Sequence, residues 1–209
     1  MYTLLRSPIP RAAAVYRSGE EKQNSRADDA ASCSPYDYDG RDSPYGYGGC
    51  YCSEQTRRTL CLPLLWGFYE ENLHKPIVNC RIESARIKPL WSESWKQRRC
   101  VIPASYYFEW KHYADSNGRI KTGDKYALQP RGSDVTYLAG LYRIEESRDL
   151  KYPVFAVLTR TPTDDLREIH DRMPLILPEN AIDEWISPSR EPNKVVDAAV
   201  TDVVIEKAV

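Results

Sequence analysis

The sequence lacks both a long apolar run and a strong excess of charge. Its 209 residues carry 29 Lys and Arg against 30 Asp and Glu, which gives a formal net charge of −1. No stretch approaches the roughly 20 apolar residues that cross a membrane, and the first residues lack the charged-then-apolar layout of a signal peptide. The even balance excludes a global basic field that would steer the protein to nucleic acid. We therefore expect a cytoplasmic protein in which any contact with DNA or RNA comes from a local patch.

Large apolar side chains are absent from one entire stretch. Residues 16–59 contain no Leu, Ile, Val, Met, Phe or Trp, and include the run SPYDYDGRDSPYGYGGCYC. Such a segment buries too little apolar area to offset the entropy of ordering it. We expect a disordered or poorly packed N-terminal segment over 1–59, a folded domain over 60–187, and a C-terminal tail over 188–209 that contains an edge strand. An interaction element is the alternative interpretation of the Tyr and Gly alternation.

Cysteine and histidine residues at the spacing of a metal site are also scarce. The six cysteines, at positions 33, 50, 52, 61, 80 and 100, include one close pair, Cys50 and Cys52. No second pair or histidine follows at the spacing of a zinc site. We expect reduced thiols in a cytosolic protein, with neither a metal nor another cofactor.

Short apolar runs separated by turn residues begin at Leu60. The patterns predict strands over 60–68, 76–84, 100–113, 125–130, 136–144, 153–159 and 173–177. They predict helices over 84–99, interrupted at Pro89, and over 162–169 and 178–186. Many short strands with a few short helices predict an α+β fold with a mostly antiparallel, barrel-like sheet.

Polar residues inside apolar or aromatic runs are candidates for chemistry; they are Asn79, Glu109, Thr159 and His170. Glu109 alternates with Phe108 and Trp110, so either the carboxyl or the aromatic pair faces the core. If Glu109 faces inward, burial will raise its pKa, and such a carboxyl beside His170 can form an acid–base pair. The alternative is an exposed Glu on an edge strand and a histidine that only stabilises its turn.

A local basic patch lies between Asn79 and Cys100. Six basic residues stand there against two acidic ones, with Trp91 and Trp95 among them. Basic groups follow phosphates, and aromatic faces stack on unpaired bases. The same pattern also fits a solvated basic helix whose two Trp, four residues apart, face the core.

Six motifs occur in a characteristic order: WGF (66–68), NCRIES (79–84), RRCVIPASYYFEW (98–110), YLAGLYR (137–143), VLT (157–159) and IHDRMPLIL (169–177). Together they resemble the SRAP family of abasic-site processing proteins, and the resemblance covers about residues 60–187. It implies a SRAP-like α+β domain that acts as a monomer on single-stranded DNA containing abasic sites, close to the nucleoid if the source is bacterial. It also implies an enzyme with self-processing peptidase and lyase chemistry that forms a covalent DNA–protein crosslink.

The resemblance assigns roles to individual residues. Asn79 matches the residue that positions the N-terminal amine and the lesion. Glu109 matches the carboxyl that moves protons on the sugar and the amine, and His170 the histidine that aids ring opening and crosslink reversal. The DNA contacts implied by the same matching and by the aromatic residues near the patch are Arg81, Thr159, Trp66 and Trp110.

One feature of the family is missing. Family members begin Met-Cys-Gly-Arg; the amine of the exposed Cys attacks the ring-opened sugar, and its thiol closes a thiazolidine ring. Residue 2 is Tyr2 here, and an internal Cys50 or Cys52 cannot replace a thiol that shares its residue with the attacking amine. We therefore expect the sequence as it stands to be unable to form the crosslink. It is either a diverged copy or has a misread N-terminus, and the change of composition at residue 60 favours the second.

Two alternatives to crosslinking remain open. One is a non-covalent module that binds single-stranded DNA through the patch at 79–100. The other is an inactive remnant of the family.

Overall fold

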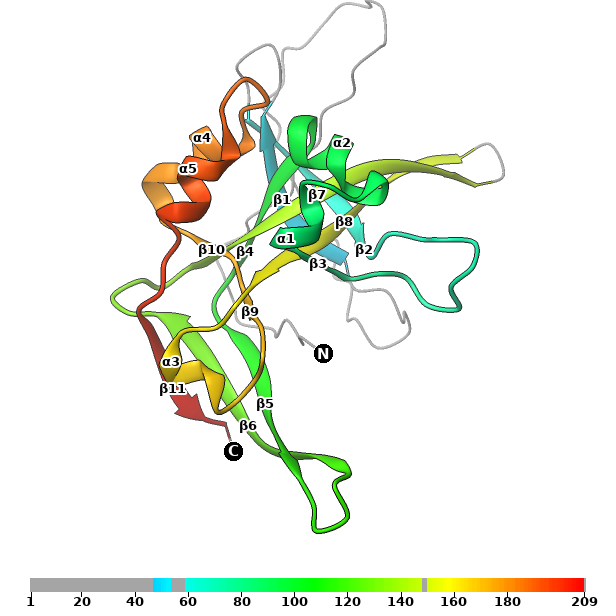
Figure 1. Cartoon of the computed structure of the whole chain (residues 1–209). Helices are drawn as coiled ribbons and strands as arrows, with labels where there is room; N and C mark the ends of the chain where they lie inside the picture. The colour runs from blue at the N-terminus through cyan, green and yellow to red at the C-terminus, as the bar shows by residue number, and fades with distance from the viewer. Residues whose placement is uncertain (1–46, 54–58, 148–149, 209) are drawn as a thin grey trace, which may run out of the picture.

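The strands form two sheets, which Figure 1 shows one above the other. The computed structural model describes residues 47–53, 59–147 and 150–208, so the expectations for residues 1–46 and 54–58 lie outside the described residues. The larger sheet contains β1 (Tyr47–Ser53), β2 (Thr59–Trp66), β3 (Asn79–Arg81), β4 (Arg99–Ala104), β7 (Thr136–Ser147), β8 (Leu150–Arg160), β9 (Met173–Pro174) and β10 (Ile176–Leu177). The smaller sheet contains β5 (Tyr107–Ala114), β6 (Ile120–Pro130) and β11 (Val203–Lys207).

The larger sheet is mixed and strongly curved. Most neighbouring strands are antiparallel, whereas β2 and β3 run parallel to β8. Because β8 also pairs with β7, the sheet curls back on itself through β7, β4, β1, β2 and β8. A single residue pair, Tyr51 with Val101, joins β1 to β4, so the curved sheet is not a fully closed barrel. The predicted α+β class with a mostly antiparallel sheet is confirmed, and "barrel-like" describes its curvature only loosely.

Strand β1 lies inside the stretch that has no large apolar residue. It pairs antiparallel with β2 along its whole length, from Tyr47 opposite Leu65 to Ser53 opposite Thr59. Backbone hydrogen bonds satisfy such a strand without any contribution from apolar side chains. Composition therefore did not indicate it.

Short helices lie outside the sheets: α1 (Ile82–Ala85), α2 (Pro89–Gln97), α3 (Asp164–Arg167), a 3-10 turn η1 (Glu179–Ala181), α4 (Ile182–Ile186) and α5 (Pro192–Asp197). The predicted interruption at Pro89 is confirmed, because α1 ends before it and α2 begins at it. The strand predicted over 76–84 was too long. Only Asn79–Arg81 pairs with β8, and the chain then turns into α1, which buries Ile82 and Ala85.

The run MPLIL does not form one continuous strand. Its first residues, in β9, pair with β8, and its last, in β10, pair with β7. Between them Leu175 donates its N–H to Leu158 and accepts a hydrogen bond from Ala139. The segment thus passes from one strand of the sheet to another. In the C-terminal tail, α5 was not predicted, and β11 lies at the edge of the smaller sheet.

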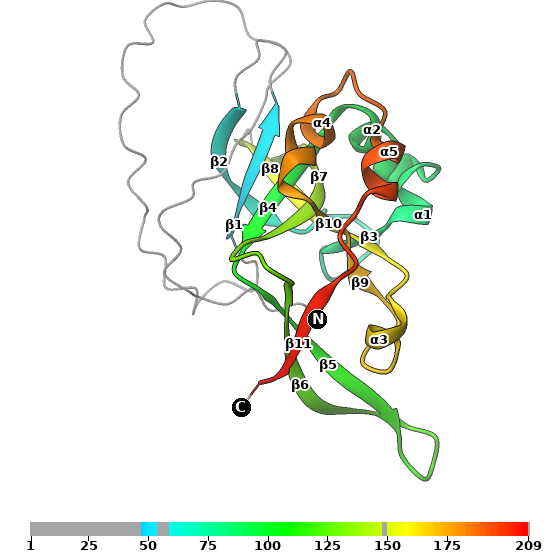
Figure 2. The same ribbon diagram turned by 90° about the vertical axis from the view of Figure 1, so that its left-hand side faces the viewer.

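Two apolar clusters cover opposite faces of the larger sheet. Alternate residues of its strands point to opposite sides, so that Leu138 belongs to the first cluster and Leu141 to the second. Helices α1, α2, α4 and α5 contribute residues to the second cluster, and Figure 2 shows these helices on one side of the larger sheet. The first cluster also receives Leu128 from the smaller sheet and Ile169 from the turn after α3. It therefore holds the smaller sheet and that turn against the larger sheet.

Candidate functional site

Strand β5 directs Glu109 into the protein. Its side chain is 3% exposed, and neither carboxyl oxygen has a hydrogen-bond partner within the described residues. Phe108 and Trp110 point to the opposite face, where the Lys125 ammonium lies 3.6 Å and 5.4 Å from the two ring centroids. Of the two orientations that the sequence left open, the structure has the inward carboxyl.

The turn after α3 brings His170 to that carboxyl. Helix α3 ends at Arg167, and the N–H groups of Ile169 and His170 both donate to the Leu166 carbonyl. Ile169 is buried, and its carbonyl accepts the N–H of His112 on β5 at 3.3 Å. As a result, His170 Nδ1 lies 3.7 Å from Glu109 Oε1. Two residues far apart in the chain thus form a close pair.

The surroundings favour the neutral form of both groups. Burial raises the pKa of Glu109 to about 7, and the Asp171 carboxylate also raises it. Burial lowers the pKa of His170 and His112 lowers it further, while Asp171 opposes both. The Arg172 N–H donates to His170 Nδ1 at 3.1 Å, so a neutral ring carries its proton on Nε2. A carboxyl and an imidazole in these states can exchange a proton with a substrate at neutral pH.

Asn79 is half-buried, and its side-chain oxygen is a second buried polar atom. It begins β3, opposite Val157 of β8, and its side-chain oxygen accepts no hydrogen bond within the described residues. Buried polar atoms are rarely left unpaired, and a ligand is a common explanation when they are. No hydrogen bond or ion pair joins Asn79 to Glu109 or His170 in the described part of the chain. Strands β3 and β9 nevertheless both pair with the C-terminal end of β8, so Asn79 and the segment that follows His170 lie at the same end of that strand.

Arg81 of β3 lies opposite Thr159 of β8, but the two side chains differ in their exposure to solvent. Arg81 is exposed, so its guanidinium is available to a phosphate. Thr159 is 3% exposed, and its hydroxyl donates to the Cys80 carbonyl at 3.5 Å. Its hydroxyl would have to leave that carbonyl to contact DNA.

The structure adds Arg172, which the sequence reasoning did not single out. Its guanidinium donates twice to the Glu83 carboxylate, at 3.0 Å and 2.8 Å, and to the Thr159 carbonyl at 2.7 Å. This bidentate hydrogen bond lowers the pKa of Glu83. Arg172 therefore joins α1, the end of β8 and the turn of His170. The sequence shows an acidic residue in the motif NCRIES and a basic residue in the motif IHDRM, but it does not indicate that the two side chains are in contact.

Neither candidate Trp contacts the Glu109–His170 pair in the described part of the chain. Trp66 stacks on Phe155, with ring centroids 6.0 Å apart, and its Nε1–H donates to the Val78 carbonyl at 2.9 Å. It therefore packs beside the residue that precedes Asn79. Trp110 lies on the face of β5 opposite Glu109.

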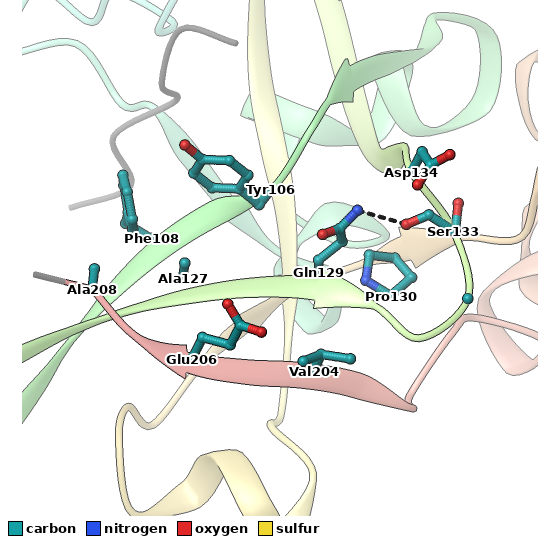
Figure 3. Close-up of a pocket in the computed structure, with 11 residues that line it drawn as sticks. Tyr106, Phe108, Ala127, Gln129, Pro130, Ser133, Asp134, Val204, Glu206 and Ala208 are labelled. Atoms are coloured by element: carbon teal, nitrogen blue, oxygen red, sulfur yellow. Dashed lines mark hydrogen bonds between the residues drawn. The ribbon is translucent and has the colours of Figure 1, made fainter.

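The outer face of the smaller sheet is hollowed into an open pocket of about 750 Å³, which Figure 3 shows. Tyr106, Gln129, Ser133 and Glu206 are among its lining residues. None of the predicted site residues lines it. It lies on the opposite side of β5 from Glu109, so it is separate from the candidate site.

The basic patch contains two kinds of residue. Trp91 and Trp95 are 4% and 6% exposed in the second cluster, which corrects the interpretation that their faces stack on bases. Arg99 is 1% exposed and donates to five backbone carbonyls, those of Trp95, Lys96, Trp185, Ser187 and Arg190. The exposed cations are Arg81, Arg86, Lys88 and Lys96. These four can contact phosphate, whereas Arg99 is a structural residue.

Within the described ranges, no group of three or more His, Cys, Asp or Glu could hold a metal ion. No helix in the same ranges is long and apolar enough to cross a membrane.

The chain is similar in sequence to curated bacterial proteins. It is 32% identical over 132 residues to the abasic site processing protein YoaM of Bacillus subtilis, which covers 60% of this chain and 56% of that protein. It is 27% identical over 128 residues to the abasic site processing protein YedK of Escherichia coli, covering 59% and 54% of the two chains. The chain thus spans little more than half the length of these relatives.

The chain is also similar to a solved structure and matches a family model. A crystal structure of a protein from Bacteroides thetaiotaomicron superposes with a TM-score of 0.64 at 17% identity, covering 78% of this chain and 74% of the other, which shows a shared fold. The family model of the SOS response associated peptidase (SRAP) matches residues 15–207. This match takes in both sheets and all the residues of the candidate site, and the chain belongs to the SRAP family.

Proposed function

We propose that this protein processes abasic sites in single-stranded DNA, with Glu109 and His170 as its acid–base pair and Asn79 positioning the lesion. One observation carries the proposal: a carboxyl that is almost fully buried, has no hydrogen-bond partner among the described residues and lies 3.7 Å from an imidazole. Such a group costs stability, and active sites are where proteins keep such groups.

The chemistry fits a sugar that opens and then reacts with an amine. In ring opening, the pair removes the proton from the C1′ hydroxyl and delivers one to the ring oxygen, which leaves an aldehyde at C1′ and a hydroxyl at C4′. An amine nitrogen then attacks the aldehyde carbon. Protonated Glu109 donates to the departing oxygen, so that water leaves as the imine forms. A carboxyl whose pKa is about 7 is available in both protonation states at neutral pH.

Thiazolidine closure needs a thiol on the same residue as the amine. Residue 2 is Tyr2 in this sequence, so the crosslink of the family is proposed only for a chain that carries an N-terminal Cys. Imine formation needs an amine alone. The peptidase and lyase activities implied by the family are proposed on the same pair of residues.

DNA is proposed to lie across the exposed cations that flank the site. Arg81, at the end of β3, is the nearest of them in the chain to Asn79. Arg86, Lys88 and Lys96 continue the exposed positive charge along α1 and α2. Trp110 and the partly buried Trp66 are kept as proposed DNA contacts, as is Thr159.

The test uses a single-stranded oligonucleotide from which one uracil has been excised. The chain as given should yield an imine that borohydride reduces to a stable adduct, visible on a denaturing gel. A variant that begins Cys-Gly-Arg after Met removal should yield the adduct without borohydride. In both, E109Q should lower the rate of adduct formation by about 100-fold, because an amide cannot donate and accept the proton.

An intact oligonucleotide of the same sequence is the control and should give no adduct. If neither protein forms an adduct under either condition, the proposed function is wrong.

The second candidate is non-covalent binding of single-stranded DNA, which the four exposed cations favour. Its sign would be salt-dependent binding of the intact oligonucleotide with no adduct to the excised one. A chain that binds neither oligonucleotide would instead be the inactive remnant.

A further inference from the structure

We propose that His112 is a positioning residue that, when protonated, holds the neighbouring His170 in its uncharged form. The inference concerns a residue of β5 to which the motifs assign no role. Its consequence for catalysis rests on the proposed function, but the coupling of the two histidines does not.

The two imidazoles are held side by side by the backbone. Their ring centroids lie 5.3 Å apart with an interplanar angle of 52°. The His112 N–H donates to the carbonyl of Ile169, the residue before His170, at 3.3 Å. Because this hydrogen bond joins β5 to the turn directly at the two rings, their proximity does not depend on flexible side chains alone.

His112 and His170 differ in their access to water. His112 is exposed, whereas the His170 side chain is 21% exposed and packs toward the buried Glu109. A charge on His170 is opposed both by burial and by a positive neighbour.

The charged groups around His170 otherwise favour its cation. From β5 it faces Glu109 at 3.7 Å as well as His112, and from its own turn it faces Asp171, whose Oδ1 lies 3.1 Å from Nδ1. The remaining nearby charges are paired: the Arg172 guanidinium with Glu83, and Lys111 with Glu168 at 3.7 Å. Among the described residues, His112 is thus the group that opposes a positive charge on His170, whereas the carboxyls of Glu109 and Asp171 favour it. In agreement, burial lowers the pKa of His170 and His112 lowers it further.

The protonation state of His170 also decides which partner its Nδ1 has. In the neutral ring, Nδ1 accepts the Arg172 N–H at 3.1 Å. In the cation, Nδ1 carries a proton and can only donate, here to an acceptor such as the Asp171 carboxylate. One nitrogen cannot do both, so charging His170 would break the hydrogen bond to Arg172. By opposing that charge, His112 keeps the turn in the form that presents a neutral base beside Glu109.

Titration of the imidazole NMR signals tests the coupling without DNA. The chain has three histidines, so H74Q, H112Q and H170Q assign every signal, and H74Q also serves as a control because His74 is exposed in the loop between β2 and β3. In H112Q the titration of His170 should move to higher pH. In H112K, which keeps a positive charge, it should not move upward, and H74Q should leave it unchanged.

Two results would overturn the proposal. The titration of His170 could stay in place in H112Q, which would mean that the rings are uncoupled. It could instead move equally in H112Q and H112K, which would mean that His112 acts by packing and not by charge.

Adduct formation with the uracil-excised oligonucleotide gives the second readout. In H112Q, the acidic limb of the pH–rate profile should move to higher pH, and the rate on that limb should fall by roughly threefold. Binding of the intact oligonucleotide should not change. If the NMR coupling is found and no form of the protein reacts with the abasic site, the proposed function fails while the histidine pair stands. If the coupling is absent, the proposal on His112 fails whatever the activity.

Discussion

At the scale of single residues, the burial of the Glu109 carboxyl costs stability. The protein buries its carboxyl on the inner face of β5 and provides no hydrogen bond to either oxygen within the described residues. The folded state therefore prefers the protonated form. This preference links the stability of the protein to pH.

We expect E109Q to stabilise the protein at alkaline pH. The pKa of Glu109 rises from 4.5 to about 7 on folding, so the folded state binds a proton that the unfolded state has released. The stability that this proton contributes is complete below about pH 4.5 and is lost as the pH rises through about 7. A neutral Gln avoids that loss, and the free energy of unfolding at about pH 8 should exceed that of the native chain by about 1–3 kcal/mol.

Urea unfolding at about pH 8 and about pH 5 measures the effect, which should be much smaller at the lower pH. The exposed Glu184, changed to Gln, is the control and should show no such dependence. A stability difference that is equal at both pH values would contradict the assignment of a raised pKa to Glu109.

At the scale of elements, a glycine ends β2 in a conformation that other residues rarely adopt. Gly67 has φ of +121°, and a Cβ there would lie 2.6 Å from Pro76 Cβ. Its N–H donates to the Phe155 carbonyl of β8 at 2.8 Å, where the chain leaves β2 for the turn toward Asn79. The motif WGF thus has a structural reason for its central residue.

We expect G67A to lower the free energy of unfolding by about 2–4 kcal/mol, because it adds backbone strain and a steric clash together. The matched control is G132A. Gly132 also has positive φ, at +74°, but no atom lies within 4 Å of a Cβ there, so its cost should be about 1 kcal/mol. Urea denaturation of both variants gives the comparison, and equal losses would show that the contact with Pro76 is unimportant.

At the scale of the whole molecule, the two apolar clusters share strands β4, β7 and β8. A strand cannot detach from one cluster while remaining in the other. We therefore expect one cooperative unfolding transition for the described domain. Each cluster contains a buried free cysteine, Cys100 in the first and Cys80 in the second.

Thiol labelling of these two cysteines measures that cooperativity. In urea, Cys80 and Cys100 should become reactive at the same midpoint when labelled peptides are separated by mass. L138A in the first cluster and L141A in the second should each cost about 2–5 kcal/mol and shift both midpoints together. Separate midpoints would show that the clusters unfold independently.

The family and the residue types of the candidate site could be predicted from the sequence. The break at Pro89 follows from a ring that cannot continue a helix, and the α+β class follows from many short apolar runs. The motifs also selected Glu109 and His170 as a pair. Strand β1 and helix α5 could not be predicted, because their own residues give no periodic apolar signal.

The sequence by itself determined which side chains are present and which elements carry them, because turn residues and apolar spacing act over a few positions. Only the tertiary structure decided that Glu109 points inward, that Arg172 binds Glu83, and that Trp91 and Trp95 are core residues. These outcomes depend on what packs against each face of an element. Alternation along β5 is equally compatible with a buried or an exposed carboxyl until the turn that carries His170 closes over one face.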